Sequence, residues 1–532
     1  MRSSVVSSRN RVGAAWRALA LVGWFAAVVG CSRPAPEGPK PPPAFPGVKL
    51  SVGAVGDPAV LVGVAAQRGE WVASRKGEID VQTDARAVED ADDLDVLIFP
   101  GREIGALIDR DLLDEIPAEV VLPPEPDAAP GQGEPRRRRP VDPDDPVEGF
   151  RYDDIAPAFR DRVAKYGSER FALPIGGSAL VLVYRRDAFT SEAVVKAAKE
   201  QGLTLEPPAT WERFDALARF LHGRDWDGDG EPNPGLAVAL GADAEGVADA
   251  TFLARAAAVA QHRDYFSFLF EADDLTPQLE LPPFVEALRA VAAWKDVGPP
   301  GAEGFDIAAA RAAFREGKAA MLIDRAEKAA EWASPPPVSV APLPGSKRVY
   351  EPMRETWDES YLNRPTYLPF GGGWLVGIRK GLDPARRDAA RDFALYLADA
   401  EVANRVIAER SFPMLSVRSS QMGRGLPDPS AAANVDVRGW TSAVSRSLMA
   451  DRVLPGLRIP DAAGYLADLS QGRIAAVAGE PADEALKRVA DAWRKRSETL
   501  GAARQLWHYR RSLNALATSS RPPPGSTERA RP

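Results

Sequence analysis

Residues 171–189, FALPIGGSALVLVYRRDAF, contain an unbroken apolar run at positions 179–184, with a glycine pair before it and three charged residues after it. An apolar run of this length between such boundaries predicts a strand that is buried on both faces. Gly176 and Gly177 allow the backbone to approach a neighbour closely or to adopt positive φ. Because this strand lies well inside a long chain, we predict that it carries the crossover between two lobes.

The composition is that of a folded globular protein with more than one hydrophobic core. The chain has 532 residues, of which 45% are hydrophobic and 27% are charged, and a single core does not extend over this length. The net charge of −8 argues against nucleic-acid binding. The one cysteine excludes an internal disulfide and cysteine-based zinc sites, and the three distant histidines offer little for imidazole catalysis.

The N-terminal region has the pattern of a bacterial lipoprotein signal. Four arginines precede an apolar stretch at positions 18–30, and Cys31 directly follows Gly30. This pattern predicts a signal peptide over residues 1–30 and acylation of Cys31, whereas an uncleaved anchor or a plain secretory signal is the alternative interpretation. The Pro-rich residues 31–47 predict an extended tether. We therefore expect the folded body at the periplasmic or extracytoplasmic face of a membrane, anchored through lipid on Cys31.

Strands and helices alternate along the first part of the chain. Positions 48–53 and 95–100 predict strands, and positions 60–73 predict a helix between them, which is typical of a doubly wound α/β sheet. Residues 123–148 are rich in Pro, Asp and Arg and interrupt this pattern. Because acidic residues surround its four consecutive arginines, we expect this insertion to be a solvated, disordered surface loop.

The later part of the chain continues the α/β pattern. Thr210 predicts the N-cap of a helix. Residues 319–323 predict a strand that ends at Asp324, and residues 338–343 predict a strand that returns to the first lobe. Positions 481–514 predict one long charged helix.

The acidic stretch DWDGDGEPN spans residues 225–233. Three aspartates at alternate positions, followed by Gly230, match the first half of a calcium-binding loop, in which short carboxylates converge on one hard cation. The twelfth position is Leu236, where such a loop has a bidentate glutamate. Two interpretations stay open: a structural calcium site, and an acidic hairpin held by Asx turns. The candidate ligands are Asp225, Asp227, Asp229, Glu231 and Asn233.

Five segments together resemble one known family. They are LPIGGSALVLVYRRDAF, DLDVLIFPGREIGALIDRDLLDEIP, PPATWERFDALARFL, AAFREGKAAMLIDRAEKA and PFGGGWLVGIRKG. Over roughly residues 48–415 the chain resembles extracellular solute-binding proteins of the sugar-binding type, the receptors of ABC importers. The resemblance implies an α/β, two-lobed fold of the periplasmic-binding-protein-like type II, with hinge strands between the lobes. Lobe 1 then comprises residues 48–183 and 338–399, lobe 2 comprises residues 184–337 and 400–515, and residues 516–532 form a disordered tail.

The resemblance also implies a ligand site between the lobes. Trp374 would stack against a sugar ring, while Gly372 and Gly373 would offer backbone N–H groups. A buried strand residue is the alternative interpretation of Trp374. Asp324, at the end of its strand, would accept hydrogen bonds from hydroxyl groups. Further candidates by their strand-end position are Ser178, Trp357, Asp57 and Arg102, and Arg102 or Arg364 could instead face an anionic solute.

The implied function is capture of a carbohydrate or a similar polar solute by a monomeric lipoprotein, followed by delivery to an ABC permease in the membrane. We expect no required cofactor apart from the calcium ion considered above. The sequence has no nucleophile elbow, phosphate loop or paired metal-ligand histidines, so we do not expect an enzyme. The alternative is a non-transporting envelope lipoprotein on the same scaffold, acting as a sensor or an interaction partner.

Overall fold

The computed structural model describes residues 43–121, 150–335 and 337–514. The predicted signal peptide, Cys31, the insertion at residues 123–148, the tail and most of the tether lie outside these residues. In the described ranges, no helix combines the length and the apolar character that crossing a membrane would require.

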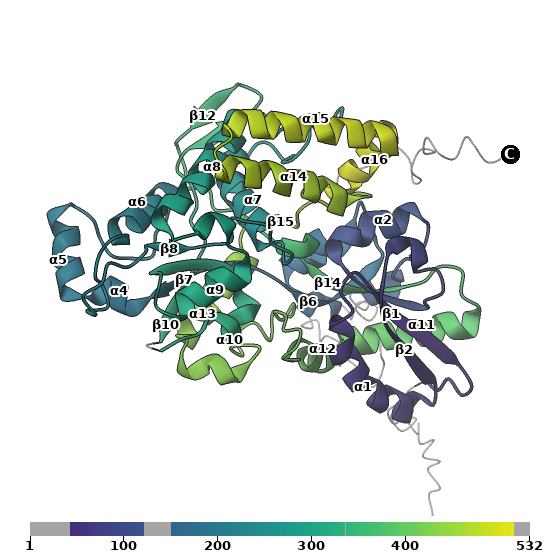
Figure 1. Cartoon of the computed structure of the whole chain (residues 1–532). Coiled ribbons are helices and arrows are strands. Elements are labelled where there is room, and N and C mark those ends of the chain that lie inside the picture. Colours follow the sequence, from purple (N-terminus) through teal and green to yellow (C-terminus); the bar gives the residue numbers. More distant parts are fainter. Residues whose placement is uncertain (1–42, 122–149, 336, 515–532) are drawn as a thin grey trace, which may run out of the picture. The chain divides into compact units, whose positions relative to one another are not determined.

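Five strands form the first sheet: β1 (Lys49–Val55), β2 (Glu78–Arg86), β3 (Val96–Pro100), β6 (Ala172–Gly177) and β14 (Gly373–Ile378). Their order is β2-β1-β3-β14-β6 (Figure 1). β1 runs parallel to β2 and β3, whereas β14 is antiparallel to β3 and β6. β3 and β14 are buried along their whole length, because helices cover the sheet. The covering helices are α1 (Val60–Arg75), α11 (Pro384–Ala398) and α12 (Ala400–Ile407).

Four strands form the second sheet: β7 (Leu180–Arg185), β8 (Leu236–Ala237), β9 (Met321–Arg325) and β10 (Val338–Pro342). Their order is β10-β7-β9-β8, with β7 antiparallel to both of its neighbours. Only Ser178 and Ala179 separate the end of β6 in the first sheet from the start of β7 in the second. The predicted crossover is therefore confirmed, and the two connected α/β sheets are those expected of the two-lobed fold.

Side-chain caps mark the start of some of the helices. Thr210 Oγ1 accepts a hydrogen bond from the Arg213 N–H at 3.3 Å, and Asp383 Oδ1 accepts one from the Arg386 N–H at 3.1 Å. The other helices are α2 (Ile104–Asp109), α3 (Ala118–Val121), α4 (Arg186–Thr190), α5 (Glu192–Glu200), α6 (Trp211–Leu221), α7 (Val247–Ala260), α8 (Pro282–Ala292), α9 (Ile307–Arg315), α10 (Ala329–Trp332), α13 (Val437–Leu448), α14 (Ala462–Val477), α15 (Ala482–Leu500) and α16 (Ala502–Ser512). Short strand pairs join β4 (Lys165–Tyr166) with β5 (Glu169–Arg170), β11 (Val349–Glu351) with β12 (Thr356–Asp358), and β13 (Thr366–Tyr367) with β15 (Val453–Leu454).

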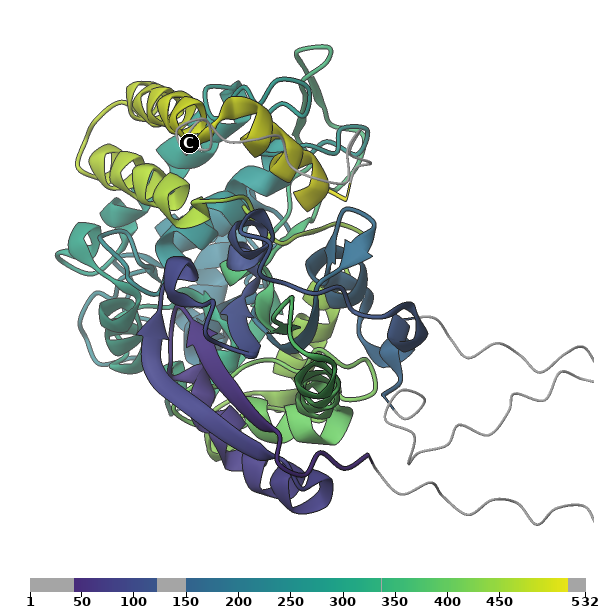
Figure 2. The same cartoon turned by 90° about the vertical axis from the view of Figure 1, so that its right-hand side faces the viewer.

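The C-terminal helices connect elements that are far apart in the sequence. α14 and α15 lie side by side in both views (Figures 1 and 2) and pack against α8. On α16, Arg504 and His508 both contact the carboxylate of Asp109 at the end of α2. Tyr509 on the same helix lies with its hydroxyl 2.9 Å from the Ser267 hydroxyl, in the segment before α8. α16 thus holds the segment before α8 and the end of α2 through one set of side chains.

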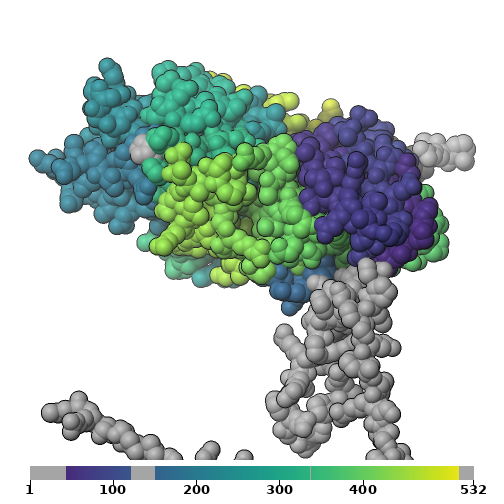
Figure 3. All heavy atoms as spheres, turned by 90° about the horizontal axis from the view of Figure 1, so that it is seen from below, coloured from purple at the N-terminus to yellow at the C-terminus, as the bar shows by residue number. Residues whose placement is uncertain are grey.

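Three predictions about the course of the chain are wrong. β10 does not return to the first sheet, because its backbone pairs with β7 in the second. Residues 400–515 do not all belong to lobe 2, since α12 packs against α1 and β6 of the first sheet's layer. In Figure 3, green surface lies beside the purple N-terminal surface. At Gly63 of α1 a Cβ would lie 2.7 Å from the Val406 carbonyl oxygen, so the two helices touch closely. The single helix expected at residues 481–514 is broken at Gly501, where φ is 95°.

Candidate ligand-binding site

A cavity of about 310 Å³ lies between loops that belong to the two sheets. Arg102 follows β3, and Phe370 and Gly371 precede β14, whereas the opposite wall comes from the N-terminal half of α7 and from α14. A volume of this size with a mixed apolar and polar wall is typical of a small-molecule site. The polar side chains that line it are Arg102, Asp243, Asp249, Tyr367 and Ser470.

The glycine-rich segment before β14 forms one edge of this cavity. Gly371, Gly372 and Gly373 have φ values of 77°, 111° and 133°, which favour glycine strongly. A Cβ on Gly371 would lie 2.1 Å from the Arg102 nitrogen, and a Cβ on Gly101 would lie 2.3 Å from the Gly371 carbonyl oxygen. Gly101 and Gly371 therefore allow the loop after β3 and the segment that leads into β14 to touch backbone to backbone.

Phe370, just before these glycines, lies between two arginines. The guanidinium carbon of Arg102 is 5.9 Å from the centre of its ring, and that of Arg325 at the end of β9 is 5.2 Å away. Both distances fit cation–π contacts. One aromatic ring thus links the end of β3 in the first sheet to the end of β9 in the second.

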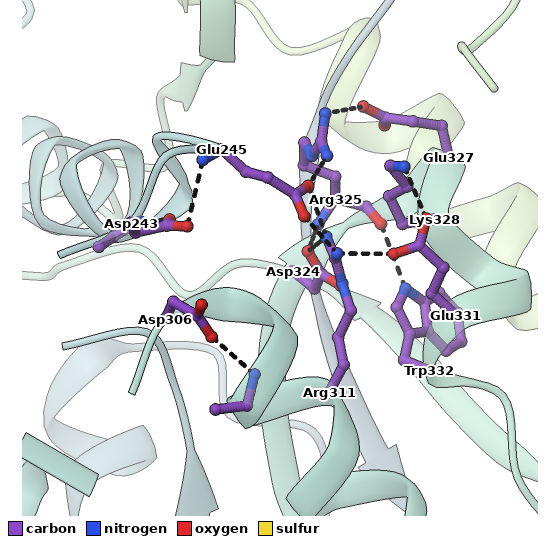
Figure 4. Close-up of polar contacts among 12 residues, drawn as sticks. Asp243, Glu245, Asp306, Arg311, Asp324, Arg325, Glu327, Lys328, Glu331 and Trp332 are labelled. Carbon is purple, nitrogen blue, oxygen red and sulfur yellow. Dashed lines mark hydrogen bonds and ion pairs between the residues drawn. The ribbon is translucent and has the colours of Figure 1, made fainter. Parts of the chain in front are cut away.

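A network of charged side chains surrounds Arg325 (Figure 4). Arg311 on α9 donates to both Asp324 oxygens, at 2.6 and 2.9 Å. It also donates to Glu245 at 2.8 Å and to Glu331 at 2.7 Å, and Arg325 pairs with Glu245 as well. Burial raises the pKa of the fully buried Asp324, and Arg311 opposes this effect. The pKa of Arg311 is raised, because hydrogen bonds to Asp324 and Glu245 outweigh the effect of burial.

Two aspartates near the start of α7 are oriented by hydrogen bonds. Asp243 Oδ2 accepts from the Ala248 N–H at 2.9 Å, which satisfies a free donor in the first turn of the helix. Asp249 accepts from Arg473 Nε at 2.7 Å, and burial raises the pKa of Asp249 in spite of this arginine. The cavity therefore offers two carboxylate acceptors whose orientation is fixed by hydrogen bonds. They lie opposite the cationic donor Arg102, beside the apolar face of Phe370.

Comparison with known proteins identifies the family. A family model described as bacterial extracellular solute-binding protein matches residues 73–419, about two thirds of the chain. This chain belongs to that family. Its members are binding proteins rather than enzymes, and the family acts outside the cytoplasm. No curated protein matches the sequence.

Solved structures with the same fold include ABC transporter solute-binding proteins. The one from Agrobacterium radiobacter K84 in complex with ribitol has 18% identity and a TM-score of 0.58, with 85% of this chain and 99% of that chain covered. Maltose-bound T. maritima MalE3 has 16% identity and a TM-score of 0.55, over 84% and 99% of the two chains. The protein from Agrobacterium vitis S4 with bound D-mannitol has 18% identity and a TM-score of 0.54, over 85% and 98%. These likenesses establish that this solute-binding protein has the fold expected from its sequence.

The predicted ligand residues Trp374 and Asp324 do not line the cavity. Trp374 lies within β14 with only 6% of its surface exposed. Its ring packs edge-on against the ring of Phe412, with 5.2 Å between the ring centres. Both Asp324 oxygens are already bonded to Arg311. Gly372 packs closely against Val163 and Gly373 against the Gly176 backbone in β6, and neither lines the cavity; their neighbour Gly371 does.

Of the four remaining candidates, the structure places only Arg102 at the cavity. Ser178, in the crossover, donates to the buried Glu327 at 2.5 Å. Trp357 stacks under Arg348, with 3.5 Å from the guanidinium carbon to the ring centre. Asp57 is exposed and caps the turn before α1 by accepting from the Ala59 N–H at 2.9 Å.

Phe370, Asp243, Asp249 and Ser470 were not predicted from the sequence. Phe370 directly precedes the triple glycine, which is a local signal that could have found it. Asp243 stands shortly before α7, where an aspartate is normally interpreted as a helix cap. Ser470 on α14 comes from a region where the family resemblance is weak, so no sequence pattern indicated it.

The acidic loop at residues 225–233 brings its aspartates together. The carboxylate oxygens of Asp225, Asp227 and Asp229 lie within 4.8 Å of one another, and all three residues are exposed. Asp225 accepts hydrogen bonds from two glycine N–H groups of the loop, and Asp227 accepts one from Asn233 Nδ2 at 2.9 Å. The geometry agrees with the predicted Asx-turn hairpin and leaves the calcium ligands a prediction.

Proposed function

We propose that this solute-binding protein captures a carbohydrate or polyol in the 310 Å³ cavity and delivers it to an ABC permease. The observation that carries the proposal is the wall itself, in which Arg102 and Phe370 from the first sheet's loops face Asp243 and Asp249 beside α7. A polyol presents hydroxyl groups to charged side chains and C–H groups to an aromatic face, and this wall supplies both. The ribitol, mannitol and maltose complexes of proteins with the same fold support the same class of solute.

One connection between the two sheets is very short, because only Ser178 and Ala179 join β6 to β7. Such strand connections act as hinges in proteins that close around a ligand. A ligand that contacts Arg102 on one side and Asp243 on the other binds the closed state better, and so shifts the population toward it. A receptor of micromolar affinity needs about 8 kcal/mol of binding free energy, which a few charge-assisted hydrogen bonds and one aromatic contact can supply.

The experiment is isothermal titration of the mature protein with ribitol, mannitol, maltose and maltotriose. We expect a Kd near or below about 100 μM for at least one of them, and a loss of about tenfold or more in the Arg102→Ala variant. Absence of binding to every sugar and polyol would contradict the proposal. Binding in vitro without solute uptake in cells would instead favour the non-transporting envelope lipoprotein.

Lipid anchoring at Cys31 and a structural calcium ion belong to the same proposal. The sole cysteine of the chain follows an apolar segment and Gly30, which supports acylation. Mass spectrometry of membrane-extracted protein tests it, with Cys31→Ala expected to release the protein from the membrane. For the acidic loop, we expect calcium to raise the melting temperature, and Asp227→Asn to remove that shift.

A further inference from the structure

A second cavity, of about 500 Å³, lies where the chain leaves β10 and approaches β13. Its apolar part is formed by Leu180 at the start of β7, Ala254 on α7 and Leu343 after β10. Tyr361 adds an aromatic ring that is partly exposed. The cavity is therefore built from segments far apart in the sequence and has room for a small organic molecule.

Four arginines line this cavity: Arg263, Arg364, Arg446 and Arg452. The only acidic residue among its lining residues is Asp451. The protein as a whole carries a net charge of −8, so the local excess of positive charge is opposite to that of the chain. Elsewhere the protein neutralises such cations directly, as the three carboxylates around Arg311 show.

Three of these arginines have no carboxylate partner within the described part of the chain. Arg364 Nη2 donates to the Ala209 carbonyl at 3.0 Å, and Arg452 Nη1 donates to the Gln261 carbonyl at 3.1 Å. Arg446 in the last turn of α13 is exposed, and its guanidinium group has no hydrogen-bond or ion-pair partner among the described residues. These guanidinium groups therefore keep unused donors next to the cavity.

The pKa values of two of these arginines are lowered. Burial lowers the pKa of Arg364, and the neighbouring positive charge of Arg446 lowers it further. Burial is also the main cause that lowers the pKa of Arg452. In addition, Arg364 Nε is buried without a hydrogen-bond partner in the described residues. Cations that repel one another and lack acceptors are stabilised by an added anion.

We propose that this cavity binds a small organic oxyanion, bearing a carboxylate or phosphate group, at a site separate from the polyol cavity. Guanidinium groups bind both oxyanions through paired N–H donors. Arg364, Arg446 and Arg452 supply these donors, while Leu343 and Tyr361 contact the carbon skeleton of the ligand. Tyr367 lines both cavities, so the test must distinguish occupation of one from occupation of the other.

The test is titration of the full-length mature protein with inorganic phosphate, citrate, glucuronate and glucose 6-phosphate, with glucose as the neutral control. We expect at least one anionic probe to bind with a Kd below about 1 mM at low salt and more weakly as salt rises. Binding by citrate or phosphate indicates that the anion alone is recognised. Binding confined to glucuronate or glucose 6-phosphate indicates that the site also needs the sugar skeleton.

Substitutions test whether the anion binds in this cavity. The double variant Arg446→Ala/Arg452→Gln should weaken anion binding about tenfold or more, whereas Arg354→Ala, an exposed arginine away from the cavity, should change it less than about twofold. Phe370→Ala, in the polyol cavity, should leave anion binding unchanged. Melting temperatures of all variants verify that they fold. Failure of all four anions to bind, or equal anion affinity in the double variant, overturns the proposal without affecting the polyol site.

Discussion

The guanidinium carbon of Arg325 lies 5.2 Å from the ring centre of Phe370. Arg325 ends β9 of the second sheet, and Phe370 leads into β14 of the first. Phe370 also lines the cavity that is proposed to bind a polyol, whereas Arg325 belongs to the charged network around Glu245. One contact therefore connects the proposed ligand site with the ion pairs of the second sheet.

Replacement of Phe370 tests the aromatic wall. We expect Phe370→Ala to weaken binding of the preferred polyol or sugar by about 1–2 kcal/mol, because it removes the ring face and its two cation–π contacts. Isothermal titration measures the change. Phe266→Ala, which removes a ring that is 60% exposed, serves as the matched control. Equal affinities of the two variants would show that the ligand does not contact Phe370.

Glycine at position 371 is expected to contribute to the stability of the fold. Gly371→Ala combines a φ of 77° with a Cβ placed 2.1 Å from the Arg102 nitrogen, and should lower the free energy of unfolding by about 2–4 kcal/mol. Gly381 has a similar φ of 83° but open space around its Cβ position. Gly381→Ala should therefore cost only about 1 kcal/mol. Urea unfolding of both variants separates the effect of the clash from that of backbone conformation.

The stability of the fold is expected to depend strongly on the Arg311–Asp324 ion pair. Arg311→Met leaves Asp324 fully buried without its main partner, and should destabilise the fold by about 3–5 kcal/mol. The double variant Arg311→Met/Asp324→Leu removes both charges and should be less destabilised than Arg311→Met alone. If the double variant is less stable than Arg311→Met, the contribution of Arg311 to stability comes mainly from its other partners, Glu245 and Glu331.

His508 is expected to make stability fall in mild acid. It is fully buried, with Nε2 at 2.8 Å from Asp109 Oδ1 and Nδ1 at 2.9 Å from the Tyr166 hydroxyl. Burial lowers the pKa of His508, although Asp109 opposes this, and the positive charges of Arg504 and Arg511 add to the effect of burial. The folded state thus favours the neutral imidazole, whereas in the unfolded chain the imidazole of His508 has its ordinary pKa of about 6.5.

The sign of the pH dependence follows from this lowered pKa. The stability contributed by neutral His508 is complete above about pH 6.5 and is lost as the pH falls toward the folded-state pKa, by up to about 1.4 kcal/mol per pH unit. Urea unfolding between about pH 7 and about pH 5 measures this slope. His508→Gln should have a smaller slope, whereas His222→Gln, at an exposed position, should retain it. An unchanged slope in His508→Gln would assign the acid sensitivity to other groups.

Local sequence patterns predicted most elements of the fold. The apolar run after Gly177 became β7, the strand at residues 95–100 became β3, and Thr210 caps α6 as expected. These features depend on neighbours in the chain, namely periodicity, glycine and capping side chains. The sheet to which β10 belongs could not be predicted in this way, because strand pairing depends on partners more than a hundred residues away.

The sequence by itself determined the α/β class and the crossover after Gly177, since these follow from apolar runs and from the alternation of strands and helices. Only the tertiary structure decided which side chains surround a cavity. It buried Trp374 in a sheet, paired Asp324 with Arg311, and brought Phe370, Asp243 and Ser470 to one wall. The reason is physical: burial and ion pairing are set by contacts between distant segments, which no local pattern encodes.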